Sequence, residues 1–307
     1  MKRAVVLGVI LSLGCLTLVV SGFQAPSPAA LTATKIEKVR DNLYVITGSG
    51  ASDLNSFSGG TTAVFITDSG VVLVDTKLPG WGPTIIDRIK SVTNKPVTTI
   101  INTHTHDDHV GSNQFFGANV ETIVHENTKA NMAKMDEFKG AKASFLPKKT
   151  YKDTMKVGAG KDEIDLYYFG RAHTNGDTFV VFPALRTMHV GDVFAWKALP
   201  YVDADNGGSV LDGGKTIGKA LETVKNVDTI INGHIPTSSW NDLKEYQQFL
   251  AEFATFARKE ANAGKTAAQA ADEYKLDPKY KAYVVSVSPA FGGARGNMEI
   301  AYNELKK

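Results

Sequence analysis

The chain has 307 residues, of which 43% are hydrophobic and 21% are charged, so its composition is that of a globular protein and not of a disordered or fibrous chain. Its 34 basic and 32 acidic residues give a formal net charge of +2, and two of the basic residues, Lys2 and Arg3, lie at the N-terminus. Without these two residues the charges balance. The chain thus carries no basic excess that would attract a phosphate backbone, and we expect no nucleic-acid partner.

Residues 1–22 have the order of a secretory signal peptide. Lys2 and Arg3 precede an apolar run from Ala4 to Val20, and small residues and prolines follow this run. We therefore expect cleavage near residues 22–25 and export to the periplasm or the medium. The mature chain would then contain no cysteine, which excludes disulfides and thiolate ligands.

Two other interpretations of this N-terminal segment stay open. The apolar run is close to the ~18 residues that a spanning helix needs, although Gly8, Ser12 and Gly14 interrupt it, so we expect no stable membrane anchor. Cys15, the only cysteine, follows Gly14 and would be the lipidated residue of a lipoprotein, but Ser12 stands where a lipobox usually has leucine.

The next residues, 23–34, are expected to form a linker, and short apolar stretches after them predict β-strands. The expected strands cover residues 42–47, 61–67, 70–75, 97–102, 120–124, 151–157, 164–169, 178–182, 186–190 and 228–231. Helical patterns cover residues 83–94, 126–138 and 216–224. This alternation predicts an α/β fold in which two mixed sheets pack together with helices outside, within a single domain over residues 35–307.

The C-terminal part is expected to add helices over residues 240–275. Apolar and aromatic residues recur every three or four positions from Trp240 to Phe256, which indicates an amphipathic helix, and an alanine-rich helix over residues 266–274 and a tail from Tyr280 follow. This part would cover a sheet, shape the pocket or form a homodimer interface, and the sequence does not choose among these roles.

The densest cluster of chemically active side chains follows the expected strand that ends at Asn102. It contains His104, His106, Asp108 and His109, with Asp107 between them. Imidazole and carboxylate ligands suit zinc or another first-row divalent ion. In an extended stretch His104 and His106 point the same way, whereas Asp108 and His109 turn toward a neighbouring position, so the spacing predicts two adjacent metals.

Three further candidates stand at the ends of other expected strands. His173 lies in a glycine-flanked loop, Asp192 follows Gly191, and His234 follows Gly233. Loop residues held on a rigid scaffold commonly carry function, so we expect these side chains to complete the metal site.

Together these residues resemble the signature of the metallo-β-lactamase superfamily. His104 to His109 fits its HxHxDH motif, and His173, Asp192 and His234 fit its later metal motifs in chain order. The strand that ends at Asp75 is similar to the family's first motif. The resemblance covers about residues 40–240.

The resemblance implies an αββα sandwich with a dinuclear site at the joined strand edges. By position, one metal would be held by His104, His106 and His173, the other by Asp108, His109 and His234, and Asp192 would bridge them. Asp75 would orient a ligand imidazole. In one group of zinc β-lactamases a cysteine occupies the bridging place, whereas aspartate stands there in glyoxalase II, acyl-homoserine lactonases and phosphodiesterases of the superfamily.

From these ligands we expect two Zn²⁺ ions, or other first-row divalent ions, and a hydroxide shared by them as the nucleophile. Asp108 would orient this hydroxide as well as ligate, and it is the expected catalytic residue. The expected reaction is hydrolysis of an ester, lactone or amide bond of a small molecule, with β-lactams among the candidates. A phosphodiesterase, a mononuclear iron dioxygenase of the same fold, or a non-catalytic binding module are the alternatives.

Several loops near these motifs are candidates for the pocket. Phe57, the pair Gly59 and Gly60, and Trp81 would flank its mouth, and residues 203–209 would line it. The remaining histidines, His125 and His189, are expected to have structural roles at a helix start and within a sheet.

Overall fold

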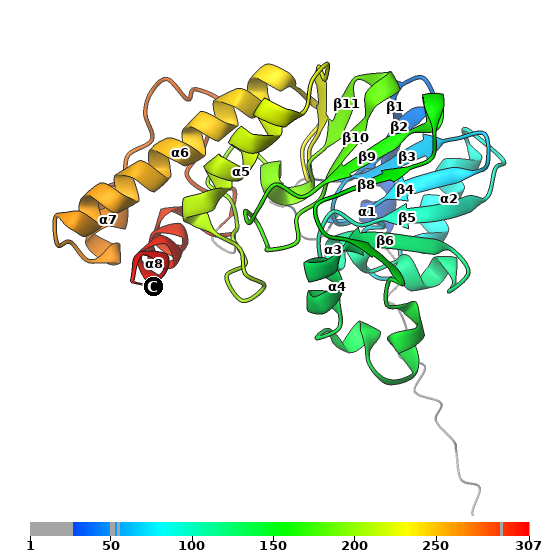
Figure 1. The fold of residues 1–307 in the computed structure, drawn as a ribbon, viewed down its shortest axis with the longest axis horizontal. Coiled ribbons are helices and arrows are strands. Elements are labelled where there is room, and N and C mark those ends of the chain that lie inside the picture. Colours follow the sequence, from blue (N-terminus) through cyan, green and yellow to red (C-terminus); the bar gives the residue numbers. More distant parts are fainter. Residues whose placement is uncertain (1–26, 50–52, 54–55, 289–290, 307) are drawn as a thin grey trace, which may run out of the picture.

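The structure, a computed structural model, describes residues 27–49, 53, 56–288 and 291–306 (Figure 1). The expected signal peptide, its cleavage site and Cys15 lie outside the described residues. In the part of the chain that is described, no helix combines the length and the apolar character that crossing a membrane requires.

The first sheet has seven strands in chain order, with the first four antiparallel and the last four parallel. Its strands are β1 (Lys35–Arg40), β2 (Leu43–Thr47), β3 (Thr62–Ile66), β4 (Val71–Val74), β5 (Val97–Ile101), β6 (Glu121–His125) and β7 (Lys149–Tyr151). The second sheet has six strands in the order β13-β12-β11-β10-β9-β8, of which only β11 and β12 pair in parallel. Its strands are β8 (Thr154–Val157), β9 (Ile164–Tyr167), β10 (Phe179–Phe182), β11 (Thr187–His189), β12 (Thr229–Ile231) and β13 (Ser238–Ser239).

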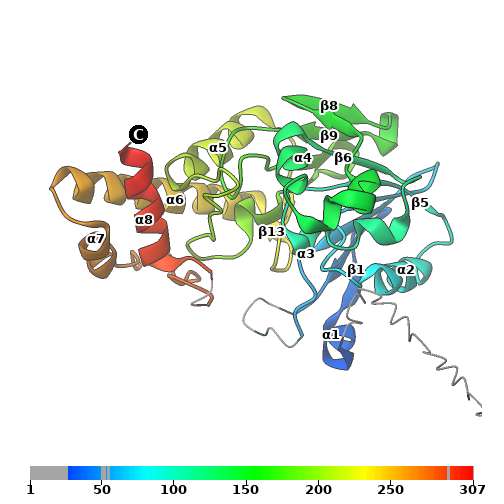
Figure 2. The same ribbon diagram turned by 90° about the horizontal axis from the view of Figure 1, so that it is seen from below.

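Helices lie on the outer faces of both sheets, at the strand ends that carry the histidine motif, and in the C-terminal part of the chain. They are α1 (Pro28–Ala33), α2 (Gly82–Lys90), α3 (Asp107–Val110), α4 (Glu126–Met132), α5 (Val210–Thr223), α6 (Trp240–Asn262), α7 (Ala267–Glu273) and α8 (Gly293–Leu305). Figure 2 shows α2 against the first sheet, whereas α6, α7 and α8 extend beyond the sandwich at the opposite end of the molecule.

Buried apolar side chains between the sheets explain why they pack face to face. Phe65 of β3 meets Phe182 of β10 edge to face, with ring centroids 5.1 Å apart. On the outer faces, Ile85 of α2 is buried against the first sheet, and Tyr246 of α6 is buried against the second. The expected αββα sandwich is confirmed.

The single strand expected over residues 151–157 is divided between two strands in the structure. Residues 151–157 divide into β7, which belongs to the first sheet, and β8, which belongs to the second. The exposed polar pair Lys152 and Asp153 separates them, so the chain crosses between the sheets at this point. Alternating apolar residues continue on both sides of the pair, which is why the sequence pattern hides the break.

Several elements differ from the sequence-based expectation. The helix expected over 216–224 begins at Val210, because Ser209 Oγ accepts from Asp212 N at 3.0 Å and caps it. Gly213 and Gly214 weaken its pattern, yet a Cβ at Gly214 would lie 3.0 Å from Ala251 N of α6, so glycine permits this close helix packing. The expected tail contains α8, the expected linker contains α1, and β1 and β13 were not predicted. The helix expected over 126–138 ends at Met132.

Candidate metal centre

The ends of four strands position the site. β4 and β5 are parallel neighbours in the first sheet, and β11 and β12 are parallel neighbours in the second. Asp75 follows β4, the histidine motif follows β5, Asp192 lies just after β11, and His234 lies just after β12. Parallel strands bring their carboxyl ends to one edge, so residues scattered along the sequence meet at the joined edges of the two sheets.

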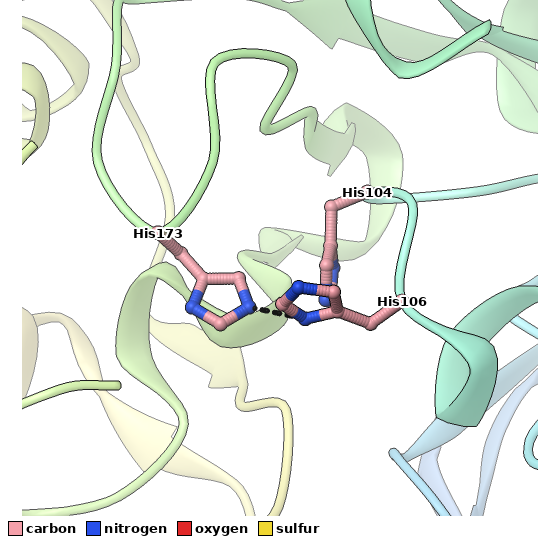
Figure 3. Close-up of side chains that lie close together, drawn as sticks. All are labelled: His104, His106 and His173. Atoms are coloured by element: carbon pink, nitrogen blue, oxygen red, sulfur yellow. Dashed lines mark hydrogen bonds between the residues drawn. The ribbon is translucent and has the colours of Figure 1, made fainter. Parts of the chain in front are cut away.

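The first histidine group contains His104, His106 and His173 (Figure 3). One ring nitrogen from each lies within 4.8 Å of the others, and His173 Nε2 is 2.9 Å from His106 Nδ1. His173 comes from the loop between β9 and β10 and faces the two histidines of the β5 end.

A second group contains Asp108, His109 and His234, and Asp192 lies between the two groups. His234 Nε2 is 3.1 Å from Asp192 Oδ2 and 3.3 Å from Asp108 Oδ2. Asp192 also groups with His104 and His109 within 4.8 Å. The structure therefore brings all seven predicted ligands together in two adjacent groups, although their role as metal ligands stays a prediction.

Asp75 fixes the orientation of two of these imidazoles. Its Oδ2 lies 2.7 Å from His109 Nδ1 and accepts from Thr103 Oγ1 at 2.7 Å, while Thr103 N donates to Oδ1 at 2.8 Å. Because the Thr103 hydroxyl donates to Asp75, it can accept from His104 Nδ1, which is 3.0 Å away. In the neutral form of each ring, the proton is then held on the nitrogen that faces away from the site, and the nitrogen that faces the site keeps the lone pair that a metal ligand requires.

The other two histidines of the first group are also held in orientation, by acceptors in the loop that follows Asp192. His106 Nε2 lies 2.7 Å from Asp203 Oδ2, and His173 Nδ1 lies 2.7 Å from Tyr201 O. Asp203 is held in turn by Asn206, whose backbone N and side-chain Nδ2 donate to it. His106 thus presents Nδ1 to the site, and His173 presents Nε2.

The charges of this cluster are balanced by protons. Burial would raise the pKa of Asp108, but the positive charges of His109 and His234 outweigh it and lower the pKa to about 2. Burial would lower the pKa of His234, but the carboxylates of Asp192 and Asp108 raise it to about 9. Asp108 and Asp192 are therefore ionised at neutral pH, and the proton on His234 balances part of their negative charge. A bound cation would balance this charge in the same way.

A buried ring nitrogen without a hydrogen-bond partner also supports a metal site here. His104 Nε2 has no hydrogen-bond partner among the described residues, although His104 is only 1% exposed. An unsatisfied buried ring nitrogen is costly unless something coordinates it. The donor set of imidazoles and carboxylates, with the outward nitrogens already paired, fits divalent metal ions.

A cavity of about 470 Å³ opens onto both groups. Phe57, Trp196 and Tyr201 lie along it, together with Asp203, so the expected pocket roles of Phe57 and of the 203–209 loop are consistent with the structure. Trp81 does not flank this cavity, because its side chain is buried against the first sheet. Gly59 and Gly60 lie beneath the second group, where a Cβ on Gly60 would come within 2.2 Å of the His109 ring.

The two remaining histidines have the structural roles expected for them. His125 Nδ1 accepts from Asn127 N at 3.2 Å and caps α4. His189 is buried at the end of β11, where its Nδ1 accepts from Gly191 N at 3.0 Å.

Sequence reasoning missed several residues of this site, among them Trp196 and Tyr201, which line the cavity. Thr103 precedes the motif, Lys77 is buried with its Nζ donating to Gly60 O at 2.8 Å, and Phe291 reaches the cavity from the C-terminal part. Burial lowers the pKa of Lys77 to about 7, against the raising effect of Asp108 and Asp75. Lys77 lies two residues after Asp75, and Thr103 directly precedes the histidine motif at residues 104–109. This closeness to the motifs was the only feature of the sequence that could have indicated a role for them in the site.

Comparison with known sequences agrees with the geometry. The family model of the metallo-β-lactamase superfamily matches residues 57–235, which include all seven predicted ligands. A metallo-β-lactamase type 2 from Elizabethkingia meningoseptica is 28% identical over 260 residues, which cover 82% of this chain and 95% of the relative. The alpha subunit of a 2,4-dinitroanisole O-demethylase from Nocardioides sp. is 30% identical over 132 residues, 41% of this chain and 38% of the relative.

Solved structures share the fold at low sequence identity. The stereoselective inverting sec-alkylsulfatase Pisa1 from Pseudomonas sp. superposes with a TM-score of 0.71 and 17% identity over 90% of this chain, which spans about half (51%) of the sulfatase. The metallo-β-lactamase TMB-1 gives a TM-score of 0.60 and 17% identity over 73% of this chain and 99% of its own. The match of the family model over more than half of the chain shows that the protein belongs to the metallo-β-lactamase superfamily and is a metal-dependent hydrolase.

Proposed function

We propose that this protein is an exported dinuclear zinc hydrolase that opens an ester, lactone or amide bond, β-lactams included. The observation that carries the proposal is the convergence of two ligand groups, His104 with His106 and His173, and Asp108 with His109 and His234, around Asp192. Each of the first three histidines has its outward nitrogen beside a fixed partner, so the site is organised before any ion binds.

Bound zinc ions supply Lewis acidity and lower the pKa of water from 15.7 to about 7. Asp108 has the exposure to meet that water, since its side chain is 19% exposed in the cavity while Asp192 is 6% exposed. The pKa of Asp108 is lowered to about 2, so it is an ionised acceptor at neutral pH. Asp108 would accept a hydrogen bond from the attacking water and orient it toward the scissile carbonyl.

Export rests on the sequence of residues 1–22 alone and is tested separately, by fractionation of cells that express the full chain. Recovery of a shortened chain outside the cytoplasm is expected. A full-length chain retained in the cytoplasm would contradict export without touching the catalytic proposal.

The activity is tested with one preparation of the zinc-loaded chain and a panel of substrates. Nitrocefin, a homoserine lactone, 4-nitrophenyl butyrate, a phosphodiester and a secondary alkyl sulfate cover the bond types named above. We expect turnover of at least one carbonyl substrate and about two zinc ions per chain by elemental analysis. One iron per chain would favour the dioxygenase alternative, and turnover of the phosphodiester or the sulfate alone would move the proposal to those bonds.

Variants connect the activity to the site. His106→Ala and Asp108→Ala should abolish turnover and lower the zinc content. Asp136→Ala, which changes a carboxylate that is 90% exposed on the surface, is the matched control and should keep both. Full activity in either site variant would refute the assignment of these residues.

A further inference from the structure

Aromatic side chains form one wall of the cavity above the two ligand groups. Phe57 and Trp196 both lie close to His234, with ring centroids 5.5 Å and 5.4 Å from its ring. Phe291 is 5.5 Å from Trp196 and 6.5 Å from Tyr201, so the rings form a continuous surface. We refer to Phe57, Trp196, Tyr201 and Phe291 as the aromatic wall.

Phe291 belongs to the C-terminal part of the chain, beyond the residues that match the family model. Two contacts hold this part against the loop that carries Trp196 and Tyr201, and a glycine permits its close approach. Ala198 forms a parallel bridge with Val284, and Asn297 Nδ2 donates to Pro200 O at 2.8 Å. Gly292 has a φ of +69°, and a Cβ there would lie 2.6 Å from Pro200 O, so glycine permits the close approach that places Phe291 in the cavity.

Once bound ions have displaced the proton of His234, the charged side chains that line the cavity are all carboxylates. Asp107, Asp108, Asp192 and Asp203 line it, and among the described residues no lysine or arginine does. Lys77 lies underneath but is fully buried, and its Nζ donates to Gly60 O. Bound ions would compensate Asp108 and Asp192, whereas Asp107 and Asp203 stand outside the ligand groups. An anionic substituent away from the reacting bond would therefore meet carboxylates and aromatic rings and no side-chain cation.

We infer that the site selects uncharged substrates with an apolar or aromatic group next to the scissile carbonyl, and that Phe291 of the C-terminal segment is a specificity-determining residue. The inference rests on the proposed carbonyl hydrolase function and narrows it, because β-lactams carry a carboxylate and would be disfavoured among the candidate substrates. In the reaction, the oxygen of water bonds to the acyl carbon as the carbon–oxygen bond to the leaving group breaks. One proton of the water ends on the leaving alcohol, and the acid product ionises.

The test uses two esters of the same shape that differ in charge, 4-butyryloxybenzamide and 4-butyryloxybenzoate. Release of the phenol is followed for each, and every kcat/KM is divided by the spontaneous hydrolysis rate of the same ester. We expect the neutral ester to be preferred by about tenfold or more, because like charges oppose each other in the anionic complex. Equal values, or a preference for the anion, would overturn the inference alone. Turnover of neither ester, with no turnover of the lactone or nitrocefin, would overturn the proposed function and the inference with it.

Two variants locate the source of the selectivity. Tyr201→Lys puts a cation at a position that is 38% exposed on the cavity, and it should shift the preference toward the anionic ester by about tenfold. Phe291→Ala should lower kcat/KM for the neutral ester by about tenfold, mainly through KM, with unchanged zinc content. Phe291→Leu keeps an apolar side chain of similar reach and should restore most of this loss.

The control is Phe115→Ala, which removes an aromatic ring that is 51% exposed outside this cavity. It should leave both esters unaffected. A Phe291→Ala variant with unchanged KM for the neutral ester, or one that loses zinc as well, would overturn the role assigned to Phe291.

Discussion

Removal of the Asp203 carboxylate tests whether hydrogen bonds around the site, and not the ligands alone, set its metal affinity. Asp203 lies outside both ligand groups, and its Oδ2 is 2.7 Å from His106 Nε2. Burial would raise the pKa of Asp203, but the hydrogen bonds from His106 and Asn206 outweigh it and hold the pKa below its usual range. The side chain is thus an anion that holds the His106 ring. In Asp203→Ala the ring loses this partner but keeps its own ligand atom.

The magnitude follows from the type of hydrogen bond. A hydrogen bond to a charged group contributes about 1.5–3 kcal/mol, and each 1.4 kcal/mol is a factor of ten in affinity, so the loss is about 10- to 100-fold. Mutations of such outer partners typically cost the same range in metal affinity or activity. The side chains of His106 and Asp203 are 21% and 11% exposed, so water can partly replace the carboxylate. We therefore expect a loss near the lower end, about tenfold.

The measurement is competition for zinc between the protein and a chromophoric chelator. Asp205→Ala is the matched control, because Asp205 lies on the same loop but is exposed to solvent. The control should bind zinc as the unchanged chain does. If Asp203→Ala bound zinc with unchanged affinity, the Asp203 carboxylate would not orient a ligand, and the reasoning from hydrogen-bond geometry to metal affinity would be wrong.

Two further predictions concern the second ligand group. Gly60→Ala should lower zinc affinity by about tenfold or more in the same competition assay, because the new Cβ would come within 2.2 Å of a His109 ring that Asp75 holds in place; unchanged binding would show that the ring can move. Zinc binding to the metal-free chain should release protons at pH 7. The pKa of His234 is raised to about 9, so His234 is protonated at pH 7 and zinc competes with that proton; affinity should rise with pH up to about 9. Calorimetry in buffers of different ionisation enthalpy measures this release, and a binding enthalpy independent of the buffer would contradict it.

The predicted ligands could be read from the sequence because two local rules coincide there. The ligands stand at the carboxyl ends of short apolar strands, and parallel pairing brings such ends together at one edge. Pairing does not bring His104 and Asp192 together, since β5 and β11 belong to different sheets and their ends meet only when the sheets pack face to face. The strand pattern is local and indicates the candidate ligands, whereas their assignment to two groups came from the resemblance of the motifs to those of the superfamily.

The supporting residues could not be found in this way. Residues 203–209 were expected to line the pocket, but nothing in their sequence indicates that Asp203 contacts a histidine 97 positions away. Phe291 reaches the cavity only because Gly292, Asn297 and the bridge at Val284 fix the C-terminal segment against another loop. These positions depend on tertiary contacts between irregular segments, which carry no periodic signal.

Asp75 shows why the two ligand groups act as one unit. Its backbone is in the left-handed region, with a φ of +65°, which costs a residue other than glycine of the order of 1–3 kcal/mol. Three contacts compensate this cost, because its N donates to Ile101 O, its carboxylate accepts from Thr103, and the same carboxylate lies beside His109. Through Thr103 the carboxylate orients His104 of the first group, and directly it orients His109 of the second. A single strained residue at the end of β4 therefore couples the geometry of both groups, and any change at Asp75 must disturb them together.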